Sequence, residues 1–261
     1  MIDSLLAGCG VGAEAVLVLL LFRTRIFRML PAFFLYVCWS LVSDAFFLWV
    51  QFRWPDAPYS LYHGQMVIDS AMIFAVLVEL AWSVLKPVRS SLPKGSWIGI
   101  AILIALAGLL LWPLAGHTIP GYLTEQGKKF FILSQTFAIL RIVVFLGMAG
   151  FSQLLAIGWR NRELQIATGL GFYSTISLAT TIIHTHQDVG TQYHWLDEVG
   201  AASYFGALVY WVLVFATKEA ERQDFSPQMQ NFLLLVGSTA RSSRVALMGL
   251  VVTKSRRKDH Q

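Results

Sequence analysis

Charged residues are scarce in this chain of 261 residues: Lys, Arg, Asp and Glu make up 13% of it, whereas 56% is hydrophobic and the mean hydropathy is +0.60. An ordinary soluble domain is about one quarter charged. This composition excludes a soluble globular protein and a disordered chain. It also excludes a nucleic-acid binder, so no nucleic-acid partner is expected.

Cysteines and the motifs of common enzymes are also few or missing. The two cysteines, Cys9 and Cys38, fall at different depths of two apolar segments and lack metal-site spacing, so no disulfide is expected. The chain contains no Gly-rich phosphate loop, no His-Glu-x-x-His and no Gly-x-Ser-x-Gly pattern. The last apolar segment has no central lysine for a retinal Schiff base. We therefore expect a protein that is not an enzyme and binds no cofactor.

Long apolar segments dominate what is present. A bilayer span needs about 20 apolar residues, and charged or Pro/Gly-containing breaks mark off seven segments: 4–22, 31–53, 61–85, 97–116, 129–158, 164–187 and 196–217. Their continuous apolarity predicts helices and not the alternating strands of an outer-membrane barrel. The predicted fold is an all-α, polytopic membrane protein, with a seven-transmembrane-helix bundle over residues 1–218 and a basic cytoplasmic tail over 219–261.

Basic residues are distributed unevenly between the two predicted sides of the membrane. Sixteen of the 20 lie in the loops and tail on one side and three on the other, which gives formal charges of +11 and −3, with −3 inside the spans. Because Lys and Arg remain on the cytoplasmic side, the N-terminus is predicted outside and the C-terminus in the cytoplasm. The first segment follows no basic region and has no cleavage pattern, so it is expected to be a retained span.

The tail combines two apolar stretches, 232–236 and 245–252, with the basic run Lys254-Ser255-Arg256-Arg257-Lys258. This combination is typical of an amphipathic interfacial helix that lies on an anionic lipid leaflet. A disordered tail and a docking site for a cytoplasmic or membrane protein partner are the alternatives.

Five ionisable residues fall within the predicted spans: Glu14, Asp44, Asp69, Glu79 and Arg141. Each costs about 2.5–3.5 kcal/mol to insert, so such groups face the bundle interior and have partners. A structural ion pair between Arg141 and one carboxylate is the simpler interpretation. Since one arginine cannot neutralise four acids, the other carboxyls are expected to be protonated, hydrogen-bonded or holding a cation. A proton or cation pathway is the functional alternative.

Hydroxyl groups on the sixth segment recur on one helical face and extend this set. The predicted buried polar network comprises Glu14, Asp44, Asp69, Arg141, Ser174, Ser177 and Thr181. Hydroxyls in spans also join helices to one another, which is the structural alternative for them. Glu79 is left out because it lies near the inner end of its segment, where it is expected to reach headgroup water or Lys86.

Histidines and acids gather on the predicted outer side, and such a combination suits a metal site or a pH sensor. The candidate outer metal or proton-sensing site comprises His63, His184, His186 and Glu198. On a helix His184 and His186 point about 200° apart, so both can ligate one ion only if the helix has ended there. Scattered surface histidines are the alternative.

Three stretches resemble a group of bacterial seven-helix inner-membrane proteins that have no known activity. They are RMLPAFFLY from Arg28 to Tyr36, the end of the third segment from Val78-Glu79 to Lys86-Pro87, and Trp159-Arg160-Asn161-Arg162 followed by Gly169-Leu170-Gly171. The resemblance covers most of the helical part and implies an inner (plasma) membrane of a bacterium. It implies no functional residues.

Together these patterns favour a multi-pass inner-membrane protein of receptor-like or sensory type, in which an outer face and a buried polar network connect to a basic tail. Membrane lipids, and a protein partner at the tail, are the expected partners. The alternatives are a small proton- or cation-coupled transporter and a structural subunit of a larger membrane complex. Against a transporter, no two halves of the chain have matching Gly/Pro-interrupted spans.

Overall fold

The helices of this protein follow its apolar segments closely. The computed structural model describes residues 2–53, 60–84, 95–116, 125–154, 162–185 and 194–217, and in this part the chain forms seven α-helices and one short 3-10 helix. They are α1 (Ile2–Arg23), η1 (Ile26–Arg28), α2 (Pro31–Arg53), α3 (Ser60–Val84), α4 (Ser96–Ala115), α5 (Glu125–Leu154), α6 (Arg162–Thr185) and α7 (His194–Ala216). The all-α prediction is confirmed, and every predicted segment end lies within four residues of a helix end. The tail 219–261 lies outside the described residues.

The outward surface of these helices is apolar. Over the described ranges six helices, α2 to α7, are long and apolar enough to cross a membrane. On α4 the side chains of Leu103, Leu109 and Leu110 are 66–78% exposed. A soluble monomer rarely exposes a continuous apolar surface of this kind, whereas a bilayer favours it and forces each spanning segment to satisfy its own backbone as a helix. The chain is therefore a helical, multi-pass membrane protein.

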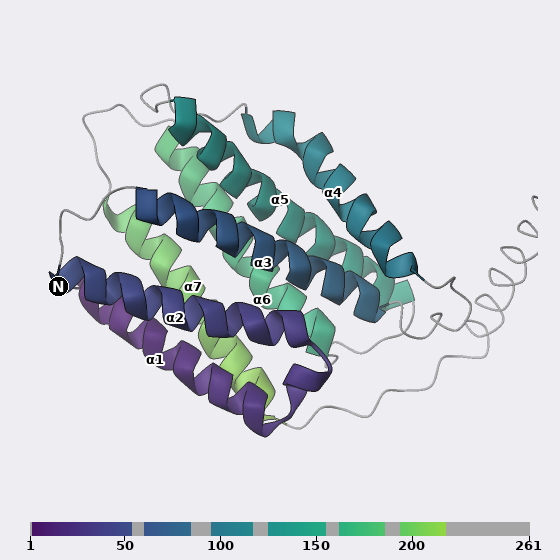
Figure 1. The fold of residues 1–261 in the computed structure, drawn as a ribbon, viewed down its shortest axis with the longest axis horizontal. Coiled ribbons are helices and arrows are strands. Elements are labelled where there is room, and N and C mark those ends of the chain that lie inside the picture. The colour runs from purple at the N-terminus through teal and green to yellow at the C-terminus, as the bar shows by residue number, and fades with distance from the viewer. Residues whose placement is uncertain are drawn as a thin grey trace, which may run out of the picture.

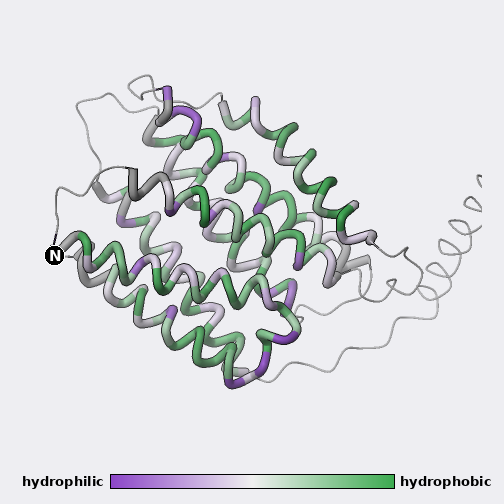
Figure 2. Tube along the Cα trace, in the orientation of Figure 1, coloured by the Kyte–Doolittle hydropathy of each residue, from purple (hydrophilic) through white to green (hydrophobic). Residues whose placement is uncertain are grey.

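Six of the described helices close into a ring, and α4 lies outside it (Figure 1). Packing runs from α1 to α2, to α3, to α5, to α6, to α7 and back to α1. α4 packs against α3 and α5 at the edge of the bundle. Its sequence contains no ionisable residue, and in Figure 2 it is hydrophobic along most of its length, while hydrophilic residues interrupt the ring helices. The helix that faces lipid most is thus the one without charges.

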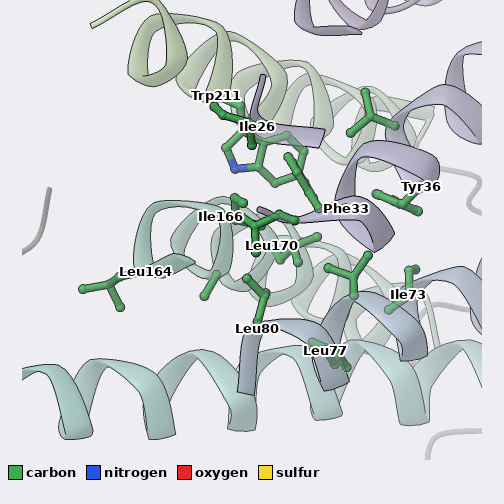
Figure 3. Close-up of a cluster of buried hydrophobic side chains, with 14 of the residues drawn as sticks. Ile26, Phe33, Tyr36, Ile73, Leu77, Leu80, Leu164, Ile166, Leu170 and Trp211 are labelled. Atoms are coloured by element: carbon green, nitrogen blue, oxygen red, sulfur yellow. The ribbon is translucent and has the colours of Figure 1, made fainter. Parts of the chain in front are cut away.

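An aromatic and aliphatic core joins α2, α6 and α7. Phe33 of α2 packs edge-on against Trp211 of α7, with ring centroids 5.3 Å apart, and lies 6.1 Å from the ring of Phe215. Ile166 and Leu170 of α6 pack into the same cluster (Figure 3). Burial of these side chains brings the three helices into one closely packed unit.

Two glycines on α6 allow this close approach. A Cβ atom at Gly169 would lie 2.3 Å from Nε1 of Trp211, and one at Gly171 would lie 2.6 Å from the ring of Phe145 on α5. Small residues at helix interfaces are typical of membrane bundles because they let neighbouring helices pack tightly. Gly169 and Gly171 therefore set the distance of α6 from α7 and from α5.

Candidate functional site

Polar side chains from all six ring helices meet near the middle of the bundle. They are Glu14 of α1, Tyr36, Ser40 and Asp44 of α2, Asp69 of α3, Arg141 of α5, Tyr173 of α6 and Tyr204 of α7. We call these eight residues the mid-bundle cluster. Seven of them lie in the central part of their helices and Tyr36 lies nearer the start of α2, so most of the cluster occupies the depth at which a membrane is most apolar.

Glu14 is the best-connected member of the cluster and has no exposed surface. Ser40 donates a hydrogen bond of 2.7 Å from Oγ to Glu14 Oε1, and the Tyr204 hydroxyl donates another to the same oxygen. The Ser40 and Tyr204 hydroxyl oxygens are themselves 2.8 Å apart. These three oxygens, which we call the oxygen triangle, join α1, α2 and α7.

Asp44 follows Ser40 by one helical turn and approaches Glu14 from α2. Its carboxyl interacts by charge with the carboxyls of Glu14 and Asp69. Two ionised carboxylates are both acceptors and repel each other, so a hydrogen bond between them would need a proton on one. Glu14 Oε2 receives no hydrogen bond from a donor within the described part of the chain.

Arg141 faces an aromatic ring and not a carboxylate. It is 7% exposed, and no ion pair joins it to an acid among the residues that the structure describes. Its Cζ lies 5.3 Å from the centroid of the Tyr173 ring, a cation–π contact, and that ring packs against Tyr204 at 5.4 Å. Arg141 and Asp69 interact by charge at longer range. The ion pair that the simpler interpretation expected is replaced by this contact, since Tyr173 occupies the face of the guanidinium.

The hydroxyls predicted on α6 have different surroundings. Ser174 is fully buried beside Tyr173, and its Oγ has no hydrogen-bond partner within the described helices. Thr181 donates from Oγ1 to the carbonyl of Ser177, 2.8 Å away, in its own helix. The structure thus brings together the four ionisable residues of the predicted network, whereas the hydrogen bond of Thr181 stays within α6.

Sequence reasoning missed four members of the cluster. Tyr36 and Ser40 precede Asp44 by two turns and one turn of α2, so a search for polar and aromatic residues at a spacing of four would have found them. Tyr173 and Tyr204 gave no such signal. Each stands in an apolar helix whose pattern does not show which face meets the other helices.

The predicted outer site falls largely outside the described residues. His186 and the side chains of His63 and His184 belong to that part, and Glu198 lies half-buried near the start of α7. Over the described ranges no three His, Cys, Asp or Glu side chains come close enough to hold a metal ion. The outer metal or proton-sensing site stays a prediction.

A second polar site holds the C-terminal end of α7. We call this end of the bundle the tail end. Arg162, the first residue of α6, donates from Nη1 to the carbonyl of Val214 at 2.5 Å and from Nη2 to that of Thr217 at 2.6 Å. Its Cζ also lies 5.2 Å from the centroid of Phe215. The last carbonyls of a helix lack partners in their own helix and favour a cation. The sequence predicted Arg162 in a cytoplasmic loop before the sixth segment, but it is the first residue of α6, is 7% exposed and caps α7.

At the same end α3 supports α6 and α2. Ser83 of α3 donates a hydrogen bond of 2.5 Å to Oε1 of Glu163, which is buried next to Arg162. Glu79 accepts hydrogen bonds of 2.9 Å from the backbone N–H groups of Ala32 and Phe33. These amides lie in the first turn of α2, where N–H groups lack partners in their own helix.

Glu79 is therefore a cap for a neighbouring helix. From its depth it was expected to reach headgroup water or Lys86. Pairing with the amides of α2 is favourable because the N-terminal end of a helix carries partial positive charge. Lys86 lies outside the described residues.

Replacing Glu79 with alanine is expected to lower the free energy of unfolding by about 1–2 kcal/mol, because two amides at the start of α2 lose their acceptor. Unfolding of the purified protein in mixed micelles, followed by tryptophan fluorescence, measures the change. Glu125→Ala is the matched control, since Glu125 is exposed and its pair with Lys128 is a surface ion pair. Equal stability of Glu79→Ala and the native protein would contradict the capping role.

Comparison of this chain with protein-family models, with curated proteins and with solved structures finds no match. The function is therefore inferred from the geometry of the two polar sites.

Proposed function

We propose that this chain is an inner-membrane protein of receptor-like, sensory type, in which the mid-bundle cluster takes up and releases an ion and α7 carries the change to a cytoplasmic tail. One observation supports this most directly: α7 contacts the cluster through Tyr204 and the Arg162 cap through Val214. Arg162 also binds Thr217, two residues before the predicted tail begins at 219. The same helix thus joins the buried charges to the segment that would signal.

Seven spans and an N-out, C-in orientation belong to this proposal. α1 is 22 residues long and packs in the ring between α2 and α7, so it is expected to cross the membrane with them. Arg23 and Arg28 are exposed at the tail end, where the predicted cytoplasmic charge collects. The inner membrane of a bacterium is the setting that the sequence resemblance implies.

The charge of the cluster favours an ion as the signal. Glu14, Asp44 and Asp69 carry three negative charges when ionised, and Arg141 supplies one positive charge. A net charge of −2 at mid-membrane depth is costly. Binding one proton or one monovalent cation would remove half of it. A change of conditions on one side of the membrane can therefore alter the charge state of the cluster.

α7 is suited to transmit such a change. Tyr204, Trp211 and Phe215 recur at intervals of seven and four residues, which places them on one face of α7. Tyr204 is bonded to Glu14, and the two aromatic rings below it pack around Phe33. A shift at Tyr204 would move this face as a unit, because packed side chains resist continuous deformation. The tail, proposed to lie on anionic lipid or a protein partner, would receive that shift.

Glu14→Gln is expected to remove the response of the tail to pH. In nanodiscs with anionic lipid, the native protein should show a several-fold difference in the rate of tryptic cleavage of its tail between mildly acidic and mildly alkaline buffer, corrected with a free peptide substrate. The variant keeps the shape of Glu14 but cannot change charge, so its cleavage rate should be the same in both buffers. Glu125→Gln is the control and should behave as the native protein does.

Two results would count against the sensory role. A tail whose cleavage rate never depends on pH or on added cations, in any lipid mixture, would contradict it. Proton or cation flux through proteoliposomes, with no change at the tail, would favour the transporter alternative, which the surplus of carboxyls over Arg141 also fits.

A further inference from the structure

We infer that the ion held by the mid-bundle cluster is a proton, bound between Glu14, Asp44 and the two hydroxyls of the oxygen triangle, and that the site as built excludes a metal cation. This deepens the proposed function, on which it rests only for the link to the tail. Three features of the cluster support it.

The oxygen triangle has three edges, but its two hydroxyls supply only two protons. Its three edges, between Glu14 Oε1, Ser40 Oγ and Tyr204 OH, are all within hydrogen-bond distance. Each linear hydrogen bond needs its own proton, but the two hydroxyls supply two. A third proton, on Glu14, would reverse the bond with Ser40 and complete the ring: Glu14 would donate to Ser40, Ser40 to Tyr204 and Tyr204 to Glu14. With Glu14 ionised, both hydroxyls donate to it, and the Ser40 and Tyr204 oxygens then face each other with lone pairs and no proton between them.

The carboxyl of Asp44 is a second place for the same proton. Asp44 and Glu14 interact by charge, and a proton on one of the two would let it donate to the other. The same proton can therefore serve the triangle or the carboxyl pair. On binding, one O–H bond forms on Glu14 or Asp44 while the donor, a hydronium ion or a buffer acid, loses its proton.

The oxygen triangle leaves little room for a metal cation. Oxygens that ligate a Ca²⁺-sized ion, or Na⁺ of similar radius, at about 2.4 Å and at right angles lie about 3.4 Å apart. The edges of the triangle from Ser40 are 2.7 and 2.8 Å. Both are lengths of direct O–H···O hydrogen bonds, and Tyr204 and Glu14 are also directly hydrogen-bonded. A metal ion would have to push α1, α2 and α7 apart.

Other titratable and charged groups of the ring helices surround Glu14. Tyr36 and Asp44 of α2 and Tyr204 of α7 interact with it directly. Asp69 of α3, Arg141 of α5 and Tyr173 of α6 interact with Tyr36, one layer further out. Arg141 is the one positive charge in this described set, so a bound proton brings the cluster from −2 to −1. Tyr204 and Ser40 are positioning residues, because they hold Glu14 Oε1 without changing charge themselves.

Infrared titration of the full-length protein in nanodiscs tests the inference directly. A carboxylic acid has a C=O stretching band that is separate from the bands of a carboxylate. The native protein is expected to gain such a band as the pH falls, with no change on adding NaCl or CaCl₂ at constant pH and ionic strength. Glu14→Gln should lose most of this pH-dependent intensity, and Glu125→Gln should lose none near neutral pH. There the exposed Glu125 stays ionised, because its hydrogen bond with Lys128 lowers its pKa.

A second variant keeps the test valid if Glu14→Gln does not fold. Tyr204→Phe removes one hydrogen bond of the Glu14 carboxyl and should shift the frequency of the band, since the C=O frequency of a carboxylic acid depends on the hydrogen bonds of the whole carboxyl. Tyr210→Phe is the matched control on the same helix: Tyr210 lies near Thr168 of α6, outside the cluster, and the band should stay in place.

The outcomes separate this inference from the proposed function. A band that titrates with pH, ignores Na⁺ and Ca²⁺ and moves in Tyr204→Phe supports the proton site, and a tail that responds in parallel supports the sensory role as well. The same band with an unresponsive tail supports the proton site and overturns the sensory role. Loss of the band on adding Na⁺ or Ca²⁺ at constant pH overturns the proton inference, as does the absence of any titrating band.

Discussion

Arg162→Ala should lower the free energy of unfolding by about 3 kcal/mol, because two hydrogen bonds from a buried charged donor are lost together. The carbonyls of Val214 and Thr217 would lose the guanidinium that caps them. The contact of that group with Phe215 would also disappear. Fluorescence-detected unfolding in mixed micelles measures the stability. The tail should also be cleaved faster by trypsin in nanodiscs, since the end of α7 is no longer held against α6.

Two further variants distinguish the cap from a general effect of charge. Arg162→Lys keeps the positive charge but lacks the planar fork that reaches two carbonyls at once, so its stability should lie between those of the native protein and Arg162→Ala. Arg53→Ala removes an exposed arginine at the opposite end of the bundle and should leave both readouts unchanged. If Arg162→Lys and Arg162→Ala were as stable as the native protein, the cap would have no role in holding α7.

Gly169→Ala should also lower the free energy of unfolding by about 3 kcal/mol, the upper part of the usual range for overpacking a core. The added Cβ would stand 2.3 Å from Trp211 Nε1 and closer than 3 Å to two further atoms of the indole. Trp211 is 2% exposed and packs against Phe33, so it has little room to turn away. Either α6 and α7 move apart or the indole leaves its rotamer.

Gly206→Ala on α7 is the matched control for Gly169→Ala. A Cβ at Gly206 would meet no atom within 4 Å, and alanine favours a helix over glycine, so this variant should be at least as stable as the native protein. Thermal unfolding followed by tryptophan emission compares the two, and a shift of emission in Gly169→Ala would report the displaced indole. Equal stability of both variants would contradict the close packing of α6 on α7.

Arg162→Ala and Gly169→Ala both disturb contacts between α6 and α7, at different depths. α7 is bound to Glu14 through Tyr204, packed on Gly169 through Trp211 and capped by Arg162 through Val214. A variant at any of these points is expected to alter the others, since contacts along one rigid helix are coupled. This makes double variants informative: Glu14→Gln combined with Arg162→Lys should show a non-additive effect on the tail.

The helices were predictable because a bilayer allows few alternatives. Continuous apolar segments about 20 residues long satisfy their backbone as helices, and the described helices begin and end within four residues of the predicted ends. The buried acids Glu14, Asp44 and Asp69 could be recognised for the same reason, since a charge in an apolar segment must have a partner. The partner of each acid could not be predicted. Glu14 bonds to Ser40 and Tyr204, which are 26 and 190 residues away from it in the sequence.

The sequence by itself determined that this is a helical membrane protein, where its helices run and which of its charges are buried, because hydropathy and length act locally along the chain. Only the tertiary structure decided that α4 lies outside the ring, that Arg141 faces Tyr173 and that Glu79 and Arg162 cap neighbouring helices. These contacts depend on how each helix is rotated about its own axis. In a segment that is apolar on every side that rotation has no clear pattern in the sequence, and side-chain packing between helices sets it.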